Sequence, residues 1–206
     1  MTATLKKDPL NIIICGVGGQ GNILASELFA SALVEKGYAV TIGETYGASQ
    51  RGGSVMSHVR ISSQTQYGPL IPVNQADIII GFEPIETLRI AREFGNTSSQ
   101  IVLDTRPNYP LAVLSGEASY PPIINLIKEL SRLCKSVQIV EAAEIAINNG
   151  NPQAANITLM GTLTALEDVP LTRDEFISTL QKRFSGSICE MNQTVFELGY
   201  SSIQLV

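Results

Sequence analysis

A glycine-rich turn near the N-terminus constrains the fold more than any other feature of this sequence. Gly16-x-Gly18-x-x-Gly21 follows a continuous apolar segment, 11–15, and precedes a helical pattern of apolar residues over 22–36. The apolar segment is too short for a helix and is typical of a strand buried on both faces of a parallel sheet. Strand, glycine turn and helix in this order predict a Rossmann-like α/β fold.

The rest of the chain continues this alternation of strands and helices. Gly37 ends the first predicted helix, and a second strand follows over 38–43, which makes a βαβ crossover at the start of an open, mostly parallel sheet with helices on both faces. The C-terminal third is helical. We expect an N-terminal tail, 1–9, and a single domain, 10–206. Further strands are predicted at 77–81, 100–104 and 137–141, and further helices at 84–93, 123–134, 153–166, 172–184 and 188–198.

The segment 54–61 differs from these strands because its apolar residues alternate with polar ones. Val59 and Ile61 share one face, and His58 and Arg60 share the other. This alternation predicts an antiparallel or edge strand with one side packed and the other presented. His58 and Arg60 are therefore expected to face a partner.

Charge and composition narrow the function classes. The 206 residues include 14 Lys and Arg against 19 Asp and Glu, a net charge of −5, and no long basic run offsets this acidity, which argues against a nucleic-acid partner. Only 16% of the residues are charged. A soluble monomer of this size usually has more charged residues on its surface. We therefore expect part of this surface to be covered by another chain in a hetero-oligomer.

The apolar runs argue against a membrane protein, and the cysteines argue against a disulfide-bonded or metal-binding protein. The runs are strand-length, far below the ~20 residues that span a bilayer, so no membrane segment is expected and the predicted location is the cytoplasm. Cys15, Cys134 and Cys189 form no C-x-x-C pair. Neither a disulfide framework, an iron–sulfur cluster nor another metal site is expected in this chain.

The glycine turn can serve a phosphate group. Backbone N–H groups at Gly18, Gly19 and Gly21 allow close approach of an anion, and the N-terminus of the following helix adds a partial positive charge. Glu44 ends the second strand, where a ribose-binding carboxylate would favour NAD. The alternative is that the glycines only permit a tight turn and close packing.

A second glycine-rich loop, 47–53, follows Glu44 directly. It places Ser49, Gln50 and Arg51 among glycines and is more elaborate than ribose binding requires. Arg51 could clamp a phosphate or carboxylate, or pair with Glu44. The alternative is a solvated hairpin loop.

Several segments together resemble one protein family. The chain is similar to the γ-type subunits or domains of 2-oxoacid:ferredoxin oxidoreductases, and within them to the small subunits of indolepyruvate enzymes. The segments that carry the resemblance are Cys15–Gly21, Gly47–Val55, Ser57–Arg60, Tyr67–Pro72, Ala76–Asp77, Phe82–Pro84, Asp104–Pro107, Gly150–Asn156, Met160–Gly161 and Glu190–Asn192.

The resemblance implies a subunit of an enzyme that carries out CoA-dependent oxidative decarboxylation of a 2-oxoacid, here an aryl pyruvate such as indolepyruvate. Thiamine diphosphate and the iron–sulfur clusters would reside in a larger α-type subunit, and ferredoxin would accept electrons through the complex. The chain has no recognisable motif for either cofactor, so it is expected to be inactive alone. Many relatives have histidine where this sequence has Tyr46, and residues 1–9 have no match.

The resemblance and the two loops together define a candidate 2-oxoacid and CoA site without an assigned catalytic residue. Two alternatives stay open, a stand-alone NAD-binding protein and an assembly module whose glycine turn binds no ligand. Glu83 and Asp104 end two predicted strands, and helix capping is the first expectation for Glu83. The candidate site residues are Gly18, Gly19, Gln20, Gly21, Asn22, Glu44, Ser49, Gln50, Arg51, Gly52, Gly53, Asn156 and Asn192.

Overall fold

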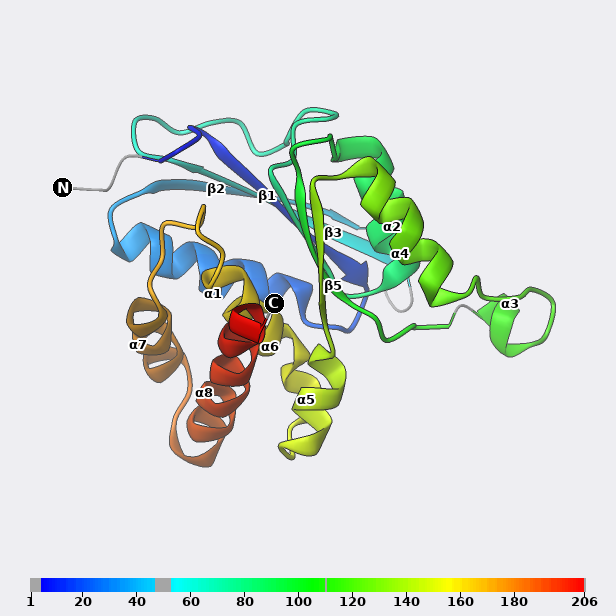
Figure 1. The fold of residues 1–206 in the computed structure, drawn as a ribbon. Helices are drawn as coiled ribbons and strands as arrows, with labels where there is room; N and C mark the ends of the chain where they lie inside the picture. Colours follow the sequence, from blue (N-terminus) through cyan, green and yellow to red (C-terminus); the bar gives the residue numbers. More distant parts are fainter. Residues whose placement is uncertain (1–4, 47–52, 110, 206) are drawn as a thin grey trace.

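A computed structural model describes residues 5–46, 53–109 and 111–205, which form a six-stranded sheet with helices on both faces (Figure 1). The predicted α/β class is confirmed. The strands are β1 (Leu10–Val17), β2 (Ala39–Tyr46), β3 (Ser54–Ser62), β4 (Ile78–Gly81), β5 (Gln100–Asp104) and β6 (Ser136–Val140). The helices are α1 (Asn22–Glu35), α2 (Pro84–Phe94), α3 (Leu111–Leu114), α4 (Ile123–Leu133), α5 (Ala142–Asn148), α6 (Ala155–Thr164), α7 (Arg173–Arg183) and α8 (Gly186–Ser201), with 3-10 turns η1 (Pro152–Ala154) and η2 (Ser202–Leu205).

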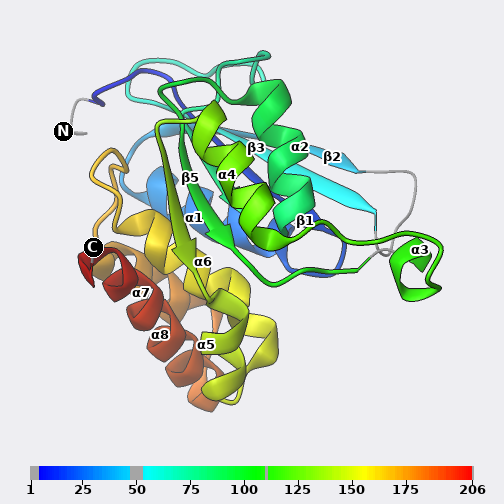
Figure 2. The same ribbon diagram turned by 45° about the vertical axis from the view of Figure 1, so that its right-hand side comes forward.

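The sheet separates two layers of helices. Helices α1, α6, α7 and α8 cover one face, and α2 and α4 cover the other (Figures 1 and 2). Ile12 and Ile14 of β1 point into the first core, while Ile13 and Cys15 point into the second, and all four are at most 1% exposed. The apolar run that predicted β1 therefore reflects burial on both faces of the strand.

The strand order is β2-β3-β1-β4-β5-β6. Strands β1, β4, β5 and β6 pair in parallel, and β3 is antiparallel to both of its neighbours. Of the two predicted alternatives for β3, antiparallel or edge, the antiparallel direction is confirmed: β3 lies between β1 and β2, and the edge strand on this side of the sheet is β2. Alternation of residue types could not reveal that both faces of β3 are covered.

The helical C-terminal third is built on a close contact between α6 and α8, which lie side by side in Figures 1 and 2. A side chain at Gly161 would place its Cβ 2.1 Å from the Phe196 carbonyl oxygen, and one at Gly199 would lie 2.0 Å from that of Thr158. The backbones approach this closely because both helices have glycine there. Thr162 Oγ1 donates to the Gly199 carbonyl oxygen at 3.0 Å.

The described part of the expected N-terminal tail, residues 5–9, packs on the sheet. Leu5 is 8% exposed and belongs to the larger core cluster. Lys6 forms ion pairs with Glu167 and Asp168, and Asp8 accepts hydrogen bonds from the backbone and hydroxyl of Ser63. These contacts hold the segment at the amino ends of the strands, away from the glycine turn.

Candidate functional site

A pocket of about 400 Å³ opens at the carboxyl edge of the parallel strands, next to the glycine turn. In open α/β sheets this edge is where ligands bind, at the point where the connections leave to opposite faces. Here β1 leads to α1 on one face, and β4 leads to α2 on the other. Three groups of residues line the pocket: Gly19, Gln20 and Phe82 after β1 and β4, Asp104, Arg106, Pro107 and Asn108 after β5, and Ala143, Ile147, Pro152, Gln153, Ala155 and Leu159 from α5 to α6.

The glycine turn is held from two sides. Gly21 is the residue before α1 and has φ +82°, a left-handed conformation that favours glycine. Asn156 at the start of α6 donates from Nδ2 to the Gly21 carbonyl oxygen at 3.2 Å, and a Cβ at Gly21 would lie 2.5 Å from that nitrogen. On the other side, Gly18 N–H donates to the Gly53 carbonyl oxygen at 2.8 Å. The structure thus brings together Gly18, Gly21, Gly53 and Asn156.

Gln20 supports the turn with its side chain. Its Oε1 accepts from Val17 N–H at 2.7 Å, and its Nε2 donates to the Phe82 carbonyl oxygen at 2.9 Å. The amide therefore joins the ends of β1 and β4. Gln20 and the exposed Gly19 line the pocket with the outer surface of the turn.

The side chain of Asn22, the first residue of α1, has no hydrogen-bond partner among the residues that the structure describes. Both Nδ2 and Oδ1 are buried and unpaired, and the residue is 3% exposed. The helix itself starts without a side-chain cap. Buried amide groups are almost always hydrogen-bonded, so both side-chain atoms of Asn22 keep the capacity to bond a further group beside the glycine turn.

Asp104 and Arg106 form the wall of the pocket at the end of β5. Asp104 is 3% exposed, and its two oxygens accept from the backbone N–H groups of Arg106 and Ala143 at 3.2 and 3.1 Å. Burial raises the pKa of Asp104 to about 6, although both hydrogen bonds favour the charged form. Arg106 is exposed, and it brings a guanidinium group to the pocket.

Asn192 lies on α8 and acts on the pocket through another residue. Its Oδ1 accepts from Asn151 Nδ2 at 3.1 Å, and Asn192 is 4% exposed. Asn151 precedes the segment Pro152–Ala155 that lines the pocket. Asn192 therefore supports the backbone of this wall.

Glu44 lies away from the glycine turn. It pairs in register with Ser57 of β3, and Ser57 in turn pairs with Ile14 of β1, two residues before Gly16. Strand β3 also separates Glu44 from β1. The expectation that Glu44 takes the place of a ribose-binding carboxylate is therefore wrong, because that role needs the strand next to β1.

His58 and Arg60, predicted to face a partner, bind a segment of their own chain, 63–77. His58 is 1% exposed, and its Nδ1 accepts from Ile71 N–H at 3.2 Å. Arg60 donates to the Leu70 carbonyl oxygen at 3.2 Å. The partner-facing expectation for His58 is wrong because this segment covers the face of β3. Burial lowers the pKa of His58 and favours the neutral ring that accepts this hydrogen bond.

The remaining predicted residues, Ser49, Gln50, Arg51 and Gly52, lie outside the described residues. Among the residues that are described, no group of three metal-ligating side chains occurs, and no helix is long and apolar enough to cross a membrane.

Sequence reasoning did not find the far wall of the pocket. Phe82 and Gln153 line it from positions that are 71 residues apart, and although both lie in segments that carry the family resemblance, neither was assigned to the site. The usable signal was the position of Asp104 and Arg106 after a predicted strand, because the carboxyl ends of parallel strands meet at one edge.

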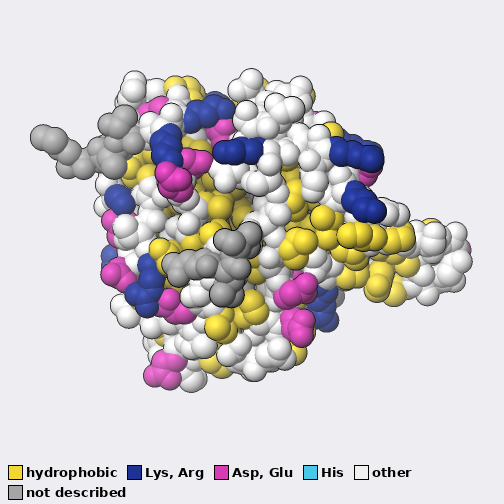
Figure 3. All heavy atoms as spheres, viewed as in Figure 1, with side chains coloured by type: hydrophobic (Ala, Val, Ile, Leu, Met, Phe, Trp, Pro, Cys, Tyr) yellow, Lys and Arg dark blue, Asp and Glu magenta, His cyan; other side chains and the backbone are white. Residues whose placement is uncertain are grey.

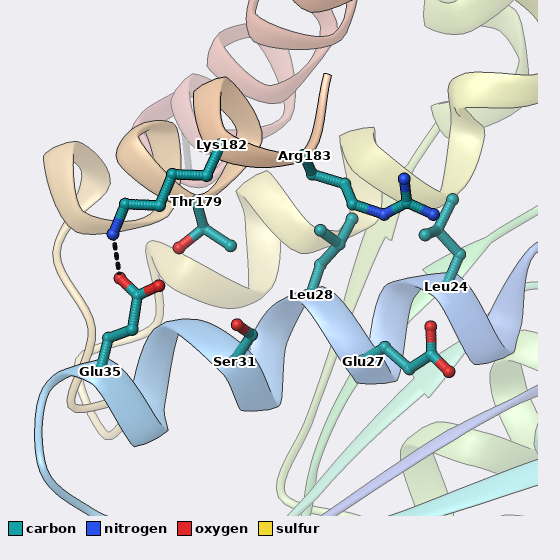
Figure 4. A pocket seen from close by; sticks show the side chains of 8 residues that line it. All are labelled: Leu24, Glu27, Leu28, Ser31, Glu35, Thr179, Lys182 and Arg183. Carbon is teal, nitrogen blue, oxygen red and sulfur yellow. Dashed lines mark hydrogen bonds and ion pairs between the residues drawn. The ribbon is translucent and has the colours of Figure 1, made fainter.

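A second groove, of about 260 Å³, lies between α1 and α7 (Figure 4). Leu24 and Leu28 form its apolar side, and the ion pair of Lys182 with Glu35, at 2.6 Å, lies at one end. None of the predicted site residues lines it. The pocket beside the glycine turn is therefore the candidate functional site.

Comparisons with known proteins agree with this fold. The family model described as pyruvate ferredoxin/flavodoxin oxidoreductase matches residues 11–202. The chain is 36% identical, over 93% of its length and 94% of the relative's, to indolepyruvate oxidoreductase subunit IorB of Archaeoglobus fulgidus. A Rossmann-like subunit with a pocket beside its glycine turn is thus the class of protein defined here. The chain belongs to the pyruvate ferredoxin/flavodoxin oxidoreductase family, as its sequence resemblance led us to expect.

Solved structures share the fold. The chain matches a keto/oxoacid ferredoxin oxidoreductase γ subunit of Geobacter sulfurreducens with a TM-score of 0.68 at 20% identity, over 95% of this chain and 99% of that one. It matches 2-oxoglutarate:ferredoxin oxidoreductase of Magnetococcus marinus, solved with 2-oxoglutarate, coenzyme A and succinyl-CoA, with a TM-score of 0.73 at 19% identity. There it covers 98% of this chain and 32% of that one, so the present chain spans about a third of that protein.

Proposed function

We propose that this chain is the small subunit of an oxidoreductase that converts an aryl pyruvate, such as indolepyruvate, with CoA as co-substrate. The similarity to the relative from Archaeoglobus fulgidus carries the proposal, because the two sequences are 36% identical over nearly the whole length of both chains. Thiamine diphosphate and the iron–sulfur clusters belong to a larger α-type subunit in this proposal, and ferredoxin accepts the electrons through the complex. Catalysis takes place in the cytoplasm.

Within the complex, the pocket beside the glycine turn receives a phosphate-bearing part of CoA. Three features support this role: the glycine turn at the N-terminus of α1, the guanidinium group of Arg106, and a pocket of about 400 Å³ with both apolar and polar lining. Backbone N–H groups at a helix N-terminus and an arginine side chain both favour phosphate. The chain contributes this wall of the site, and the larger subunit contributes the reacting cofactors.

Reconstitution tests the division of labour. The purified chain alone, with CoA, thiamine diphosphate and an aryl pyruvate, is expected to reduce no acceptor dye under anaerobic conditions. Activity is expected when the larger subunit from the same host is added. Turnover by this chain alone, or no activity of the complete complex with any 2-oxoacid, would refute the proposed function.

The phosphate-binding role has its own test in the reconstituted enzyme. Arg106→Gln removes an exposed cation at the pocket, so the KM for CoA is expected to increase about tenfold, the effect of losing one charge-assisted contact. Arg132→Gln is the matched control, because Arg132 is also exposed but lies on α4, outside the pocket. Equal KM values for both variants and the unmodified enzyme would place the CoA phosphates elsewhere.

A further inference from the structure

An extended arm leaves the sheet beside the pocket. Residues 105–109 and 111–122, here called the arm, connect β5 to α4 and carry the short helix α3, which stands away from the rest of the molecule (Figures 1 and 2). The base of the arm, Arg106–Asn108, lines the pocket. The position of the arm therefore determines the shape of that wall.

The arm has few charged residues that could fix it by ion pairs. Between Pro107 and Ile127 the sequence contains one charged residue, Glu117. Tyr109 and Leu114 are 47% and 68% exposed, and an apolar band in Figure 3 runs from the start of α4 toward the arm. Few apolar side chains of the arm are buried, so a small number of specific contacts must hold it.

Glu83, the residue before α2, supplies such a contact. It is 2% exposed, and its Oε2 accepts from Glu86 N–H at 2.9 Å, which confirms the predicted cap of α2. Its other oxygen, Oε1, accepts from the hydroxyl of Tyr120 in the arm, and the backbone of Asn108 also hydrogen-bonds the carboxyl group. The ring of Tyr120 in turn packs edge-on against Tyr109, with ring centres 5.2 Å apart.

Capping does not explain this arrangement by itself. A cap needs one oxygen, and a short exposed side chain such as serine or aspartate performs it without burying a charge. Glu83 is buried, and burial raises its pKa. The second oxygen is directed to Tyr120, so both oxygens of the buried carboxyl group have a partner, one in α2 and one in the arm.

We propose that Glu83 is a positioning residue that anchors the arm through Tyr120 and so fixes Arg106–Asn108 as a wall of the ligand pocket. The identity of the ligand rests on the proposed function, whereas the anchoring does not. Because Glu83 lies between the end of β4 and the start of α2, the anchor ties this wall of the pocket to the strand next to β1. Loss of the anchor is expected to loosen the pocket while leaving the sheet intact.

Hydrogen–deuterium exchange on the isolated chain tests the anchor directly. Tyr120→Phe removes the hydroxyl and keeps the ring that contacts Tyr109, so amides of the arm are expected to exchange about tenfold faster, while those of β1 and α7 stay unchanged. Tyr109→Phe is the matched control, because it also removes one tyrosine hydroxyl from the arm but leaves the bond to Glu83. Unchanged exchange in Tyr120→Phe, or the same change in both variants, would overturn the anchor.

The reconstituted enzyme tests what the anchor does. Tyr120→Phe is expected to raise the KM for CoA about tenfold and to change kcat less than twofold, and Tyr109→Phe to change neither. A looser arm without an increase in KM would overturn the positioning role. If the unmodified complex is inactive with every 2-oxoacid, the proposed function fails, and the exchange measurement still decides whether Glu83 anchors the arm.

Discussion

Asn22 and Asn156 offer a sharp test because they are two buried amides beside the same turn with opposite hydrogen-bonding states. Within the described parts of the chain, neither side-chain atom of Asn22 has a hydrogen-bond partner, whereas Asn156 Nδ2 donates to the Gly21 carbonyl oxygen. An unpaired buried polar group costs about 1–3 kcal/mol. Asn22→Ala removes that cost, but it leaves a small cavity that costs about 1 kcal/mol. The free chain is therefore expected to gain about 1 kcal/mol, a rise in Tm of about 3 °C.

Asn156→Ala has the same change in size but should have the opposite effect. It breaks the hydrogen bond to Gly21 and leaves that carbonyl oxygen without its side-chain partner, so the free energy of unfolding should fall by about 1–2 kcal/mol. Urea unfolding followed by circular dichroism measures both variants, and equal m-values would show that the folded and unfolded states are otherwise comparable. A loss of stability in Asn22→Ala as large as that in Asn156→Ala would refute the reasoning. We also expect Asn22→Ala to weaken the reconstituted enzyme, since a residue kept at a cost to folding is typical of a functional site.

Three further predictions concern packing, pH and cofactor choice. Gly199→Ala should destabilise the chain by more than about 3 kcal/mol in thermal unfolding, because a Cβ would lie 2.0 Å from the Thr158 carbonyl oxygen and neither helix backbone can move freely. The pKa of His58 is lower in the folded chain than in the unfolded chain. Below pH ~6.5 the unfolded chain therefore binds a proton at His58 that the folded chain does not yet bind. Stability should therefore fall from pH 6.5 downward until the folded pKa is passed, and urea midpoints of His58→Gln should lack this component. Fluorescence titration of the free chain with NADH should show no saturable binding in the micromolar range, and such binding would restore the dinucleotide alternative.

Local patterns predicted individual elements well because they report on short-range physics. The glycine turn placed the start of α1 at Asn22, and β5 has the predicted bounds, 100–104. The helix expected from residue 172 begins at Arg173, after a capping box in which Thr172 and Glu175 bond to each other's backbone N–H groups. Each of these signals depends on residues within six positions of one another, so no knowledge of distant contacts was needed.

The errors arose where distant segments decide the outcome. The alternation in β3 correctly assigned His58 and Arg60 to one face, but the burial of His58 depends on Ile71, which is 13 residues further along the chain. The complete lining of the pocket was not predicted because its walls come from distant segments between Gly19 and Leu159. Glu83 illustrates both cases. Its cap was predictable from Pro84, and its bond to Tyr120 was not.

The position of β3 between β1 and β2 distinguishes this sheet from sheets that bind dinucleotides. In a dinucleotide-binding sheet the second strand lies beside the first, about 5 Å away, and brings its carboxylate to the ribose. Here β3 occupies that place, so β2 and Glu44 lie roughly 10 Å from β1, twice the spacing of neighbouring strands. The first residues of the inserted segment instead contact the turn, through Gly53 and Gly18. The glycine pattern is thus retained without a carboxylate on the neighbouring strand, which suits a ligand whose remaining contacts lie toward β4 and β5, where the pocket opens.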